Sequence, residues 1–295
     1  MLAAAVISHV FCGFSFIASR TALDFAHVFD LLSHRFLIAF LLMSAVMVIK
    51  RIKLNIKGNK RAFLLVMLEL CEPVIYFFGE QYGILHSSTI FSGVMIAVIP
   101  IVSILAAAPI LKERPTVGQL VFSVVSVAGV IGIGLMTRSR GSLDLIGVAA
   151  LTIAVLAVCA YTLLGRGISK EFTAFERTYM MLAVGAVVFT ILAAFRCNFS
   201  IAAYIAPFLD VPYLISSLFL GVCCSSISYF LVSYAITYLS VAQATVFANL
   251  TTAVSVFAGA VLLKEPFSWL GLAFCAMILP EIYGVQRSAR SADGK

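Results

Sequence analysis

Ten long runs of apolar residues follow one another along the chain, joined by short polar or charged links. The runs lie at residues 2–20, 29–49, 62–84, 88–111, 116–136, 143–165, 174–195, 212–237, 241–263 and 266–286. Each is close to the roughly 20 residues that an α-helix needs to cross the hydrocarbon core of a bilayer. The runs are apolar on every face, whereas the strands of a membrane barrel alternate. The pattern therefore predicts an all-α membrane protein with ten transmembrane helices.

Part of this pattern occurs twice. The stretch over residues 69–116, moved by 152 positions, places Leu111-Lys112-Glu113 on Leu263-Lys264-Glu265. It also places these residues on identical ones: Phe78, Tyr82, Ile84, Ser88, Val94, Val102, Ser103, Ala106 and Ala108. An odd number of helices per repeat makes the second repeat enter the membrane inverted, as in many secondary transporters. We expect two five-helix repeats and a disordered tail, over residues 1–138, 139–287 and 288–295.

Charge gives this arrangement an orientation. With 62% hydrophobic and 11% charged residues, the chain does not fit a single water-soluble core. If the N-terminus is cytoplasmic, fourteen Lys and Arg residues, Arg177 among them, fall on the inner side and five on the outer side. This bias predicts that both termini are cytoplasmic. The net charge of +7 is explained by these loops, so we expect no nucleic-acid partner.

The remaining composition excludes several classes of protein. The first run starts at Leu2 without a preceding basic region, so we expect it to be retained as a helix rather than cleaved as a signal peptide. The seven cysteines form no CxxC pair, and no catalytic motif, metal cluster or nucleotide-binding loop is present in the sequence. We therefore expect no enzyme, no metal and no cofactor, and transport driven by a gradient.

The third apolar run carries an unusual number of carboxylates. Glu69, Glu72, Tyr76 and Glu80 recur at spacings of 3, 4 and 4, so one helix face should carry all four. At 1.5 Å per residue from the inner surface, Glu72 lies about 15 Å deep, near the midplane. A carboxylate facing lipid there costs at least about 3 kcal/mol. We interpret Glu72, with Glu69, as meeting a cationic substrate group or a coupling proton; the alternative is that these acids only fix helix packing.

Further candidates lie on the other helices. His9 shares the depth of Glu69 and could relay a proton to it, or could simply pack. In the ninth run Asn249 and Thr252 lie near the midplane. Asn249 either donates a hydrogen bond to the substrate or forms one between helices. The eighth run replaces the acidic stripe with small residues, of which Gly221 suits close helix packing and Ser228 suits either packing or substrate.

Aromatic side chains could surround a cation near the midplane. The candidates for such a cage are Phe16, Tyr76, Phe77, Tyr229 and Tyr234.

An outer gate is the last predicted site. Arg35 on the second helix and Glu80 on the third lie at similar depths from the outer surface, so a charge pair is predicted between them. Asp24 and Asp30 are competing partners for Arg35, and Arg20 is a competing partner for Glu80.

Several short motifs, taken in order, resemble the EamA-type transporters of the drug/metabolite transporter superfamily over nearly the whole chain. They are Cys12-Gly13-Phe14-Ser15-Phe16, similar to that family's WGxxF, Arg35-Phe36, Glu80-Gln81-Tyr82-Gly83, Ser87-Ser88 with Pro100, and the turns Lys112-Glu113-Arg114-Pro115-Thr116 and Lys264-Glu265-Pro266. The sequence departs from the family where Cys12 replaces the usual Trp and Thr252 stands in place of a Pro. Similar proteins carry amino acids, sugars, nucleotide sugars, choline and drugs.

Together these features predict a secondary-active transporter of the inner (plasma) membrane that works by alternating access on a small polar or amphipathic metabolite, such as an amino acid or amine. The resemblance implies export. Alternatives are an importer of a cationic nutrient (choline or a polyamine) and, from another class, a non-transporting sensor or scaffold. Expected partners are the substrate, the lipid bilayer and a coupling proton, with the chain a monomer or weak homodimer.

Overall fold

The computed structural model describes residues 2–54, 62–96, 98–111, 144–168, 171–238 and 247–262. Within these residues every regular element is a helix, and there is no strand. The predicted fifth and tenth helices, the start of the ninth and the tail lie outside the described residues.

The described helices follow the apolar runs closely. In chain order they are α1 Leu2–Leu23, α2 Val28–Ile49, α3 Ala62–Glu69, η1 Leu70–Tyr76, α4 Phe77–His86, α5 Thr89–Ile96, α6 Ile99–Leu111, α8 Leu145–Ile168, α9 Ala174–Arg196, α10 Ile201–Ile205, η2 Ala206–Leu209, α11 Val211–Leu218, η3 Phe219–Ser228, α12 Tyr229–Tyr238 and α14 Ala248–Leu262. Five spans in this part of the chain are long and apolar enough to cross a membrane: Ala3–Leu23, Val28–Ile49, Leu145–Gly165, Ala174–Arg196 and Val211–Ala235.

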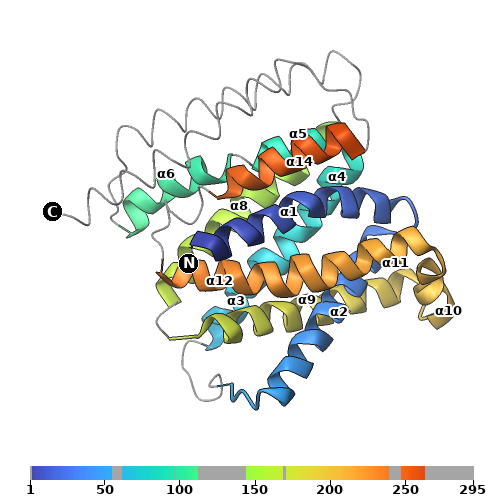
Figure 1. Ribbon diagram of the computed structural model, residues 1–295, viewed down its shortest axis with the longest axis horizontal. Coiled ribbons are helices and arrows are strands. Elements are labelled where there is room, and N and C mark those ends of the chain that lie inside the picture. Colours follow the sequence, from blue (N-terminus) through green and yellow to red (C-terminus); the bar gives the residue numbers. More distant parts are fainter. Residues whose placement is uncertain are drawn as a thin grey trace.

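Helices from the two ends of the chain pack against one another. α2 lies along α9 and η3, α1 lies along α14 and η3, and α4 and η1 lie against α8 (Figure 1). Close approach is helped by Gly221, because a Cβ atom there would come within 3.1 Å of the Arg35 carbonyl oxygen and 2.7 Å of Ile38. The packing role predicted for Gly221 therefore agrees with its position, and it brings η3 against the helix that carries Arg35.

The helix predicted as the third membrane span is not a regular α-helix. α3, η1 and α4 run without a break over residues 62–86, but η1 is a π-helix, in which backbone hydrogen bonds span five residues. Pro73 lies inside η1, and its missing N–H cannot continue an α-helical ladder. The sequence analysis expected a regular helix here, which is wrong for residues 70–76.

The eighth transmembrane helix has the same form. α11, η3 and α12 are continuous over residues 211–238, and η3 is again a π-helix. Moving η1 by 152 positions gives residues 222–228, which fall inside η3. Ser226 Oγ donates to Gly221 O at 3.0 Å and Ser228 Oγ donates to Cys223 O at 3.0 Å, both five residues back. These bonds occupy carbonyl oxygens within the widened turns.

The predicted fourth helix over residues 88–111 is also interrupted. α5 ends at Ile96, Val98 forms a turn in which its N–H donates to Met95 O at 3.2 Å, and α6 begins at Ile99. Pro100, the second residue of α6, has no N–H to continue the hydrogen-bond ladder of α5, whereas proline is tolerated in the first turn of a helix. One unbroken fourth helix is therefore a wrong prediction, whereas the expected tight link before it is present between α4 and α5.

Candidate functional site

Arg35 and Glu80 meet inside the helix bundle. Arg35 Nη1 lies 4.0 Å from Glu80 Oε2, and both side chains are buried. Arg35 Nε also donates to Ser225 Oγ at 2.7 Å. Glu80 Oε1 accepts from the Tyr76 hydroxyl at 2.6 Å, and Oε2 accepts from Gln81 Nε2 at 3.0 Å. The pair therefore joins α2, α4 and η3.

Of the three competing partners considered for this pair, Asp30 and Arg20 are engaged elsewhere, and Asp24 is exposed. Asp30 is buried, and it forms an ion pair with Arg196 at the end of α9, whose Nε lies 3.1 Å from Asp30 Oδ1. Arg20 Nη1 donates to the backbone carbonyl of Ile84 at 3.3 Å. The structure therefore leaves Glu80 as the carboxylate paired with Arg35 among the described residues.

Glu72 lies within the π-helix η1 and is 2% exposed. The side chains of Tyr161 on α8 and Tyr229 on α12 lie beside its carboxylate. Its Oε2 atom has no hydrogen-bond partner with good geometry among the described residues. A buried carboxylate bordered by hydroxyls from two other helices can accept a proton or a cationic nitrogen, which is the chemistry predicted for it.

Glu69 ends α3 directly before η1 and is completely buried. Arg177, on the first turn of α9, and Glu72 are the charged groups that act on it. The sequence analysis counted Arg177 among the charges of the inner surface, but the side chain is 0% exposed inside the bundle. A sequence signal for this position exists: Thr173 and Glu176 form a capping box that places Arg177 within the first turn of a helix.

One ring of the predicted aromatic cage already contacts a cation of the protein. Phe16, Tyr76, Phe77 and Tyr229 belong to one buried cluster. The guanidinium carbon of Arg35 lies 4.3 Å from the centre of the Phe77 ring, within the range of a cation–π contact. Tyr234 does not join this cluster: it is 37% exposed and contacts Tyr238, so its assignment to the cage is wrong.

The structure does not pair His9 with Glu69. His9 Nδ1 lies 2.7 Å from Ala5 O, its ring contacts Phe247, and its backbone carbonyl accepts from Thr251 at 3.1 Å. The His9–Glu69 relay is therefore not supported, and the packing alternative describes His9 better.

Two further predicted residues make helix-to-helix bonds. Ser228 Oγ donates to Ser8 O at 3.3 Å, which joins η3 to α1. Thr252 Oγ1 donates to Gly93 O at 2.7 Å, which joins α14 to α5. Asn249 is in α14, but its side chain lies outside what the structure describes.

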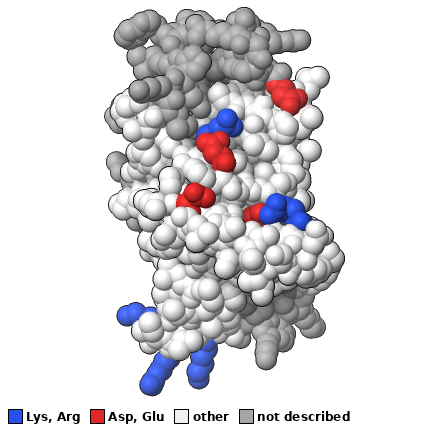
Figure 2. All heavy atoms as spheres, turned by 90° about the vertical axis from the view of Figure 1, so that its right-hand side faces the viewer, with Lys and Arg blue, Asp and Glu red and all other residues white. Residues whose placement is uncertain are grey.

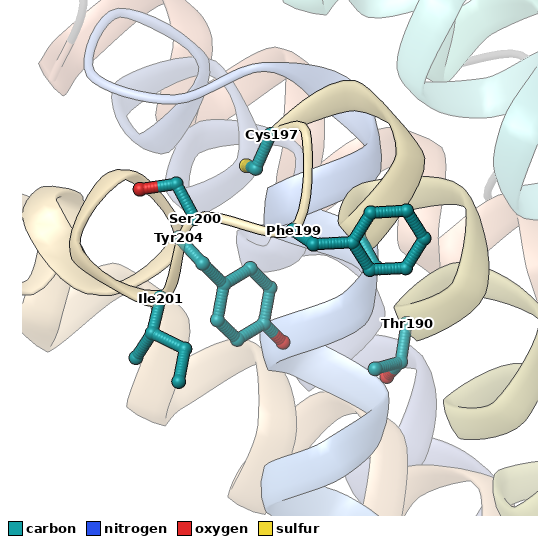
Figure 3. A pocket seen from close by; sticks show the side chains of 7 residues that line it. Thr190, Cys197, Phe199, Ser200, Ile201 and Tyr204 are labelled. Carbon is teal, nitrogen blue, oxygen red and sulfur yellow. The ribbon is translucent and has the colours of Figure 1, made fainter.

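The end of the molecule that carries α10 has few charged groups and a mostly apolar cavity (Figure 2). Viewed onto this end, Lys, Arg, Asp and Glu form small isolated groups on an otherwise uncharged surface (Figure 2). A mostly apolar cavity of about 200 Å³ lies here, and Figure 3 shows Phe199 and Tyr204 among its lining residues. The Tyr204 hydroxyl forms a hydrogen bond with Ser33 Oγ on α2, with 2.6 Å between the two oxygens. Within the described residues no group of three or more His, Cys, Asp or Glu could hold a metal ion.

Long apolar helices with charged side chains buried between them define a multi-pass membrane protein. The chain belongs to the EamA-like transporter family, whose model matches residues 1–135 and 145–285. It is therefore a membrane transporter by family, and the resemblance seen in its motifs is confirmed.

Individual relatives agree with this assignment. The chain is 32% identical over 284 residues to the "Uncharacterized transporter YcxC" of Bacillus subtilis, covering 95% of this chain and 91% of the relative. It is 25% identical over 287 residues to an uncharacterized transporter of Archaeoglobus fulgidus, covering 94% and 95%. A protein of known crystal structure shares the fold with a TM-score of 0.69 at 14% identity, covering 97% and 98% of the two chains.

Proposed function

We propose that the chain is a secondary-active transporter of the inner (plasma) membrane that moves a small polar or amphipathic metabolite with a cationic nitrogen, such as an amino acid or an amine. Alternating access between two inverted five-helix repeats is the mechanism. Export is the proposed direction, and it rests on the resemblance to the family. The second candidate, uptake of choline or a polyamine, is favoured by the number of carboxylates on the third helix.

The observation that carries this proposal is the position of Glu72. It is a buried carboxylate in a π-helical segment, a backbone form that often occurs at functional sites. Tyr161 and Tyr229 lie beside it, and one of its oxygens lacks a partner among the described residues. A cationic group or a coupling proton would supply the missing charge.

The pair of Arg35 and Glu80 is the proposed outer gate. Arg35 and Glu80 come from different helices, and both are buried. A conformation that separates them within the bundle leaves each charge uncompensated, which raises the free energy of that conformation. A contact that differs between two conformations can bias their populations. In this proposal the pair closes while the carrier faces the cytoplasm.

Flux into proteoliposomes tests the role of Glu72. A thermal-shift screen of amino acids, amines and nucleosides on the purified protein first identifies a ligand, because binding to the folded state raises the melting temperature. Glu72→Gln should then abolish flux while keeping the melting temperature near that of the wild type. Cys71→Ser, one position earlier in η1, is the matched control and should transport normally. Wild-type flux with unchanged pH dependence in Glu72→Gln would contradict the proposal.

A further inference from the structure

Arg177 is a buried arginine that the proposed outer gate and the Glu72 contact leave unused. Its Nη2 donates to the Ser233 carbonyl and, at 2.6 Å, to Thr237 Oγ1, both on α12. Its Nε and Nη1 have no hydrogen-bond partner in the part of the chain that the structure describes. A guanidinium that is 0% exposed thus has two nitrogens with unused hydrogen-bonding capacity.

Glu69, on the neighbouring helix, is a buried acceptor that lacks donors, as Arg177 is a buried donor that lacks acceptors at two of its nitrogens. The side chain is 0% exposed, and neither carboxylate oxygen has a hydrogen-bond partner among the described residues. Arg177 acts on it electrostatically, but the two make no ion-pair contact. α3 and η1 both pack against α9 and α8, and Arg177 is near enough to act on this carboxylate.

Two more groups extend the same region. Glu72 Oε2 and Tyr161 Oη lack partners with hydrogen-bond geometry, and Tyr161 is electrostatically coupled to Glu69, Glu72 and Arg177. Gly165 on α8 leaves room beside the arginine, since a Cβ atom there would lie 3.9 Å from Arg177 Nη1. Donors and acceptors therefore gather at the junction of three helices without a hydrogen bond of good geometry at these atoms, although each unpaired buried group is costly.

A molecule that bridges these groups must offer both signs of charge. A carboxylate accepts charge-assisted hydrogen bonds from a guanidinium, and a cationic nitrogen donates them to glutamates. A simple amine or choline would leave Arg177 without a partner, and a simple anion would face two glutamates. A zwitterion satisfies both sides and adds no net charge to a buried site.

We propose that Arg177, Glu69, Glu72 and Tyr161 form a subsite for a zwitterionic ligand, in which Arg177 receives a carboxylate and the two glutamates receive a cationic nitrogen a few bonds away. This inference rests on the proposed function, because it names the substrate class of the site around Glu72. The groups are buried in this conformation, so the ligand enters when the helices separate during the transport cycle.

Matched ligands test the subsite on the purified full-length protein. The twenty common amino acids are screened by thermal shift, and for each one that binds, its amide removes the carboxylate and its N-acetyl derivative removes the cation. Both derivatives should bind about 10-fold to about 100-fold more weakly than the parent, the size expected for loss of a charge-assisted hydrogen bond. Equal affinity of the amide or of choline would overturn the inference.

Arg177→Gln provides the residue-level test. It should weaken binding of the zwitterion to the level of the amide and leave binding of the amide unchanged. The matched control is Arg196→Gln, which removes an arginine held by Asp30 at the other end of α9 and should change neither affinity. If Arg177→Gln does not fold, Arg177→Lys keeps the charge, and it should reduce zwitterion affinity without changing that of the amide.

The outcomes separate this inference from the proposed function. Unchanged zwitterion affinity in the Arg177 variants means that the region holds water only, and it overturns the subsite. Cationic ligands that bind through Glu72 regardless of a carboxylate would overturn the subsite alone. Transport of the identified substrate that is unaffected by Glu72→Gln would instead refute the proposed function.

Discussion

The helices predicted as the third and eighth membrane spans share a backbone form and differ in chemistry. Each contains a π-helical segment, η1 in the third and η3 in the eighth, at positions related by the 152-residue offset. The offset places Glu69 on Gly221, Glu72 on Cys224 and Glu80 on Val232. One helix therefore carries three carboxylates at positions where the other is uncharged.

The two helices also accommodate their wide turns differently. η1 contains Pro73, whereas η3 uses the hydroxyls of Ser226 and Ser228 to bond carbonyls five residues back. The uncharged helix then supplies partners to the charges: Ser225 accepts from Arg35, and Tyr229 lies beside Glu72. The comparison teaches that the irregular backbone is separable from the charge, and that a neutral copy of the segment can serve as the lining against which the charged copy works.

Exchanging the charges of the Arg35–Glu80 pair should give the largest effect. Arg35→Glu and Glu80→Arg each leave a buried charge without compensation, so the free energy of unfolding should fall by about 3–5 kcal/mol and transport should be lost. The double variant should recover part of the lost stability and part of the lost transport. Thermal unfolding and proteoliposome flux measure these changes.

The double variant decides whether the pair acts as a gate. Cysteines at positions 35 and 80, placed in a background free of other cysteines, should crosslink in one state of the carrier. A double charge exchange no better than the worse single variant, together with no crosslink, would remove the outer gate.

Adding a carboxylate to the neutral helix tests the comparison from the other side. Cys224 is completely buried, and its thiol donates to Phe11 O at 3.4 Å. Cys224→Glu should lower the free energy of unfolding by about 3 kcal/mol, because it adds a buried acid that competes with Glu80 for Arg35. Cys224→Ser, which keeps the size, should stay near the wild type. If the acidic variant folds and transports normally, the difference in charge between the two helices has no functional meaning.

Removing single hydroxyls from η3 should have smaller, graded effects. Ser226→Ala and Ser228→Ala should each lower the free energy of unfolding by about 0.5–1.5 kcal/mol, the usual net value of a neutral hydrogen bond. Ser225→Ala should cost about 1.5–3 kcal/mol, because its partner, Arg35, is charged. Denaturant unfolding of the three variants measures the free energy of unfolding that each one loses. An equal loss at all three positions would show that Ser225 has no special role as a partner of Arg35.

The smallest effect is expected where α4 ends, at His86. Asp144 Oδ1 accepts from Ile146 N at 3.0 Å and Oδ2 lies 2.8 Å from His86 Nδ1 at the end of α4, and these contacts lower the pKa of Asp144 below its ordinary value of 3.8. A carboxyl with a lowered folded pKa stabilises the fold above pH 3.8, and this stabilisation is lost as the pH falls through the folded pKa. Asp144→Asn should flatten the acid limb of a melting-temperature curve. An acid limb identical to that of the wild type would show that the contact adds no stability.

Much of the described helix pattern could be predicted from the sequence, because the thickness of the bilayer fixes the length of an apolar run. The run at 174–195 corresponds to α9, Ala174–Arg196, and the carboxylates of the third run are buried as their cost in lipid requires. The similar depths of Arg35 and Glu80 predicted their pairing but left Asp24, Asp30 and Arg20 as competing partners. These inferences depend on distance along a helix, which a sequence contains directly.

The rest depends on contacts between distant segments. A shift from α-helical to π-helical hydrogen bonding leaves hydropathy unchanged, so only Pro73 marked the irregular turn. Arg177 lies close to a helix start, where a charge near the inner surface is the ordinary interpretation. Its burial is decided by Ser233 and Thr237, more than 50 residues further along the chain.

The π-helical segment also affects how related chains can differ in length. Deleting one residue from a regular α-helix rotates one side of it by about 100° relative to the other. A widened segment can instead lose a residue by relaxing toward an α-helix, which leaves the flanking turns nearly in phase. Chains one residue shorter between Glu69 and Glu80 can therefore keep both carboxylates facing the same neighbours. An alignment of this family should allow a gap within residues 70–76 before it treats either glutamate as absent.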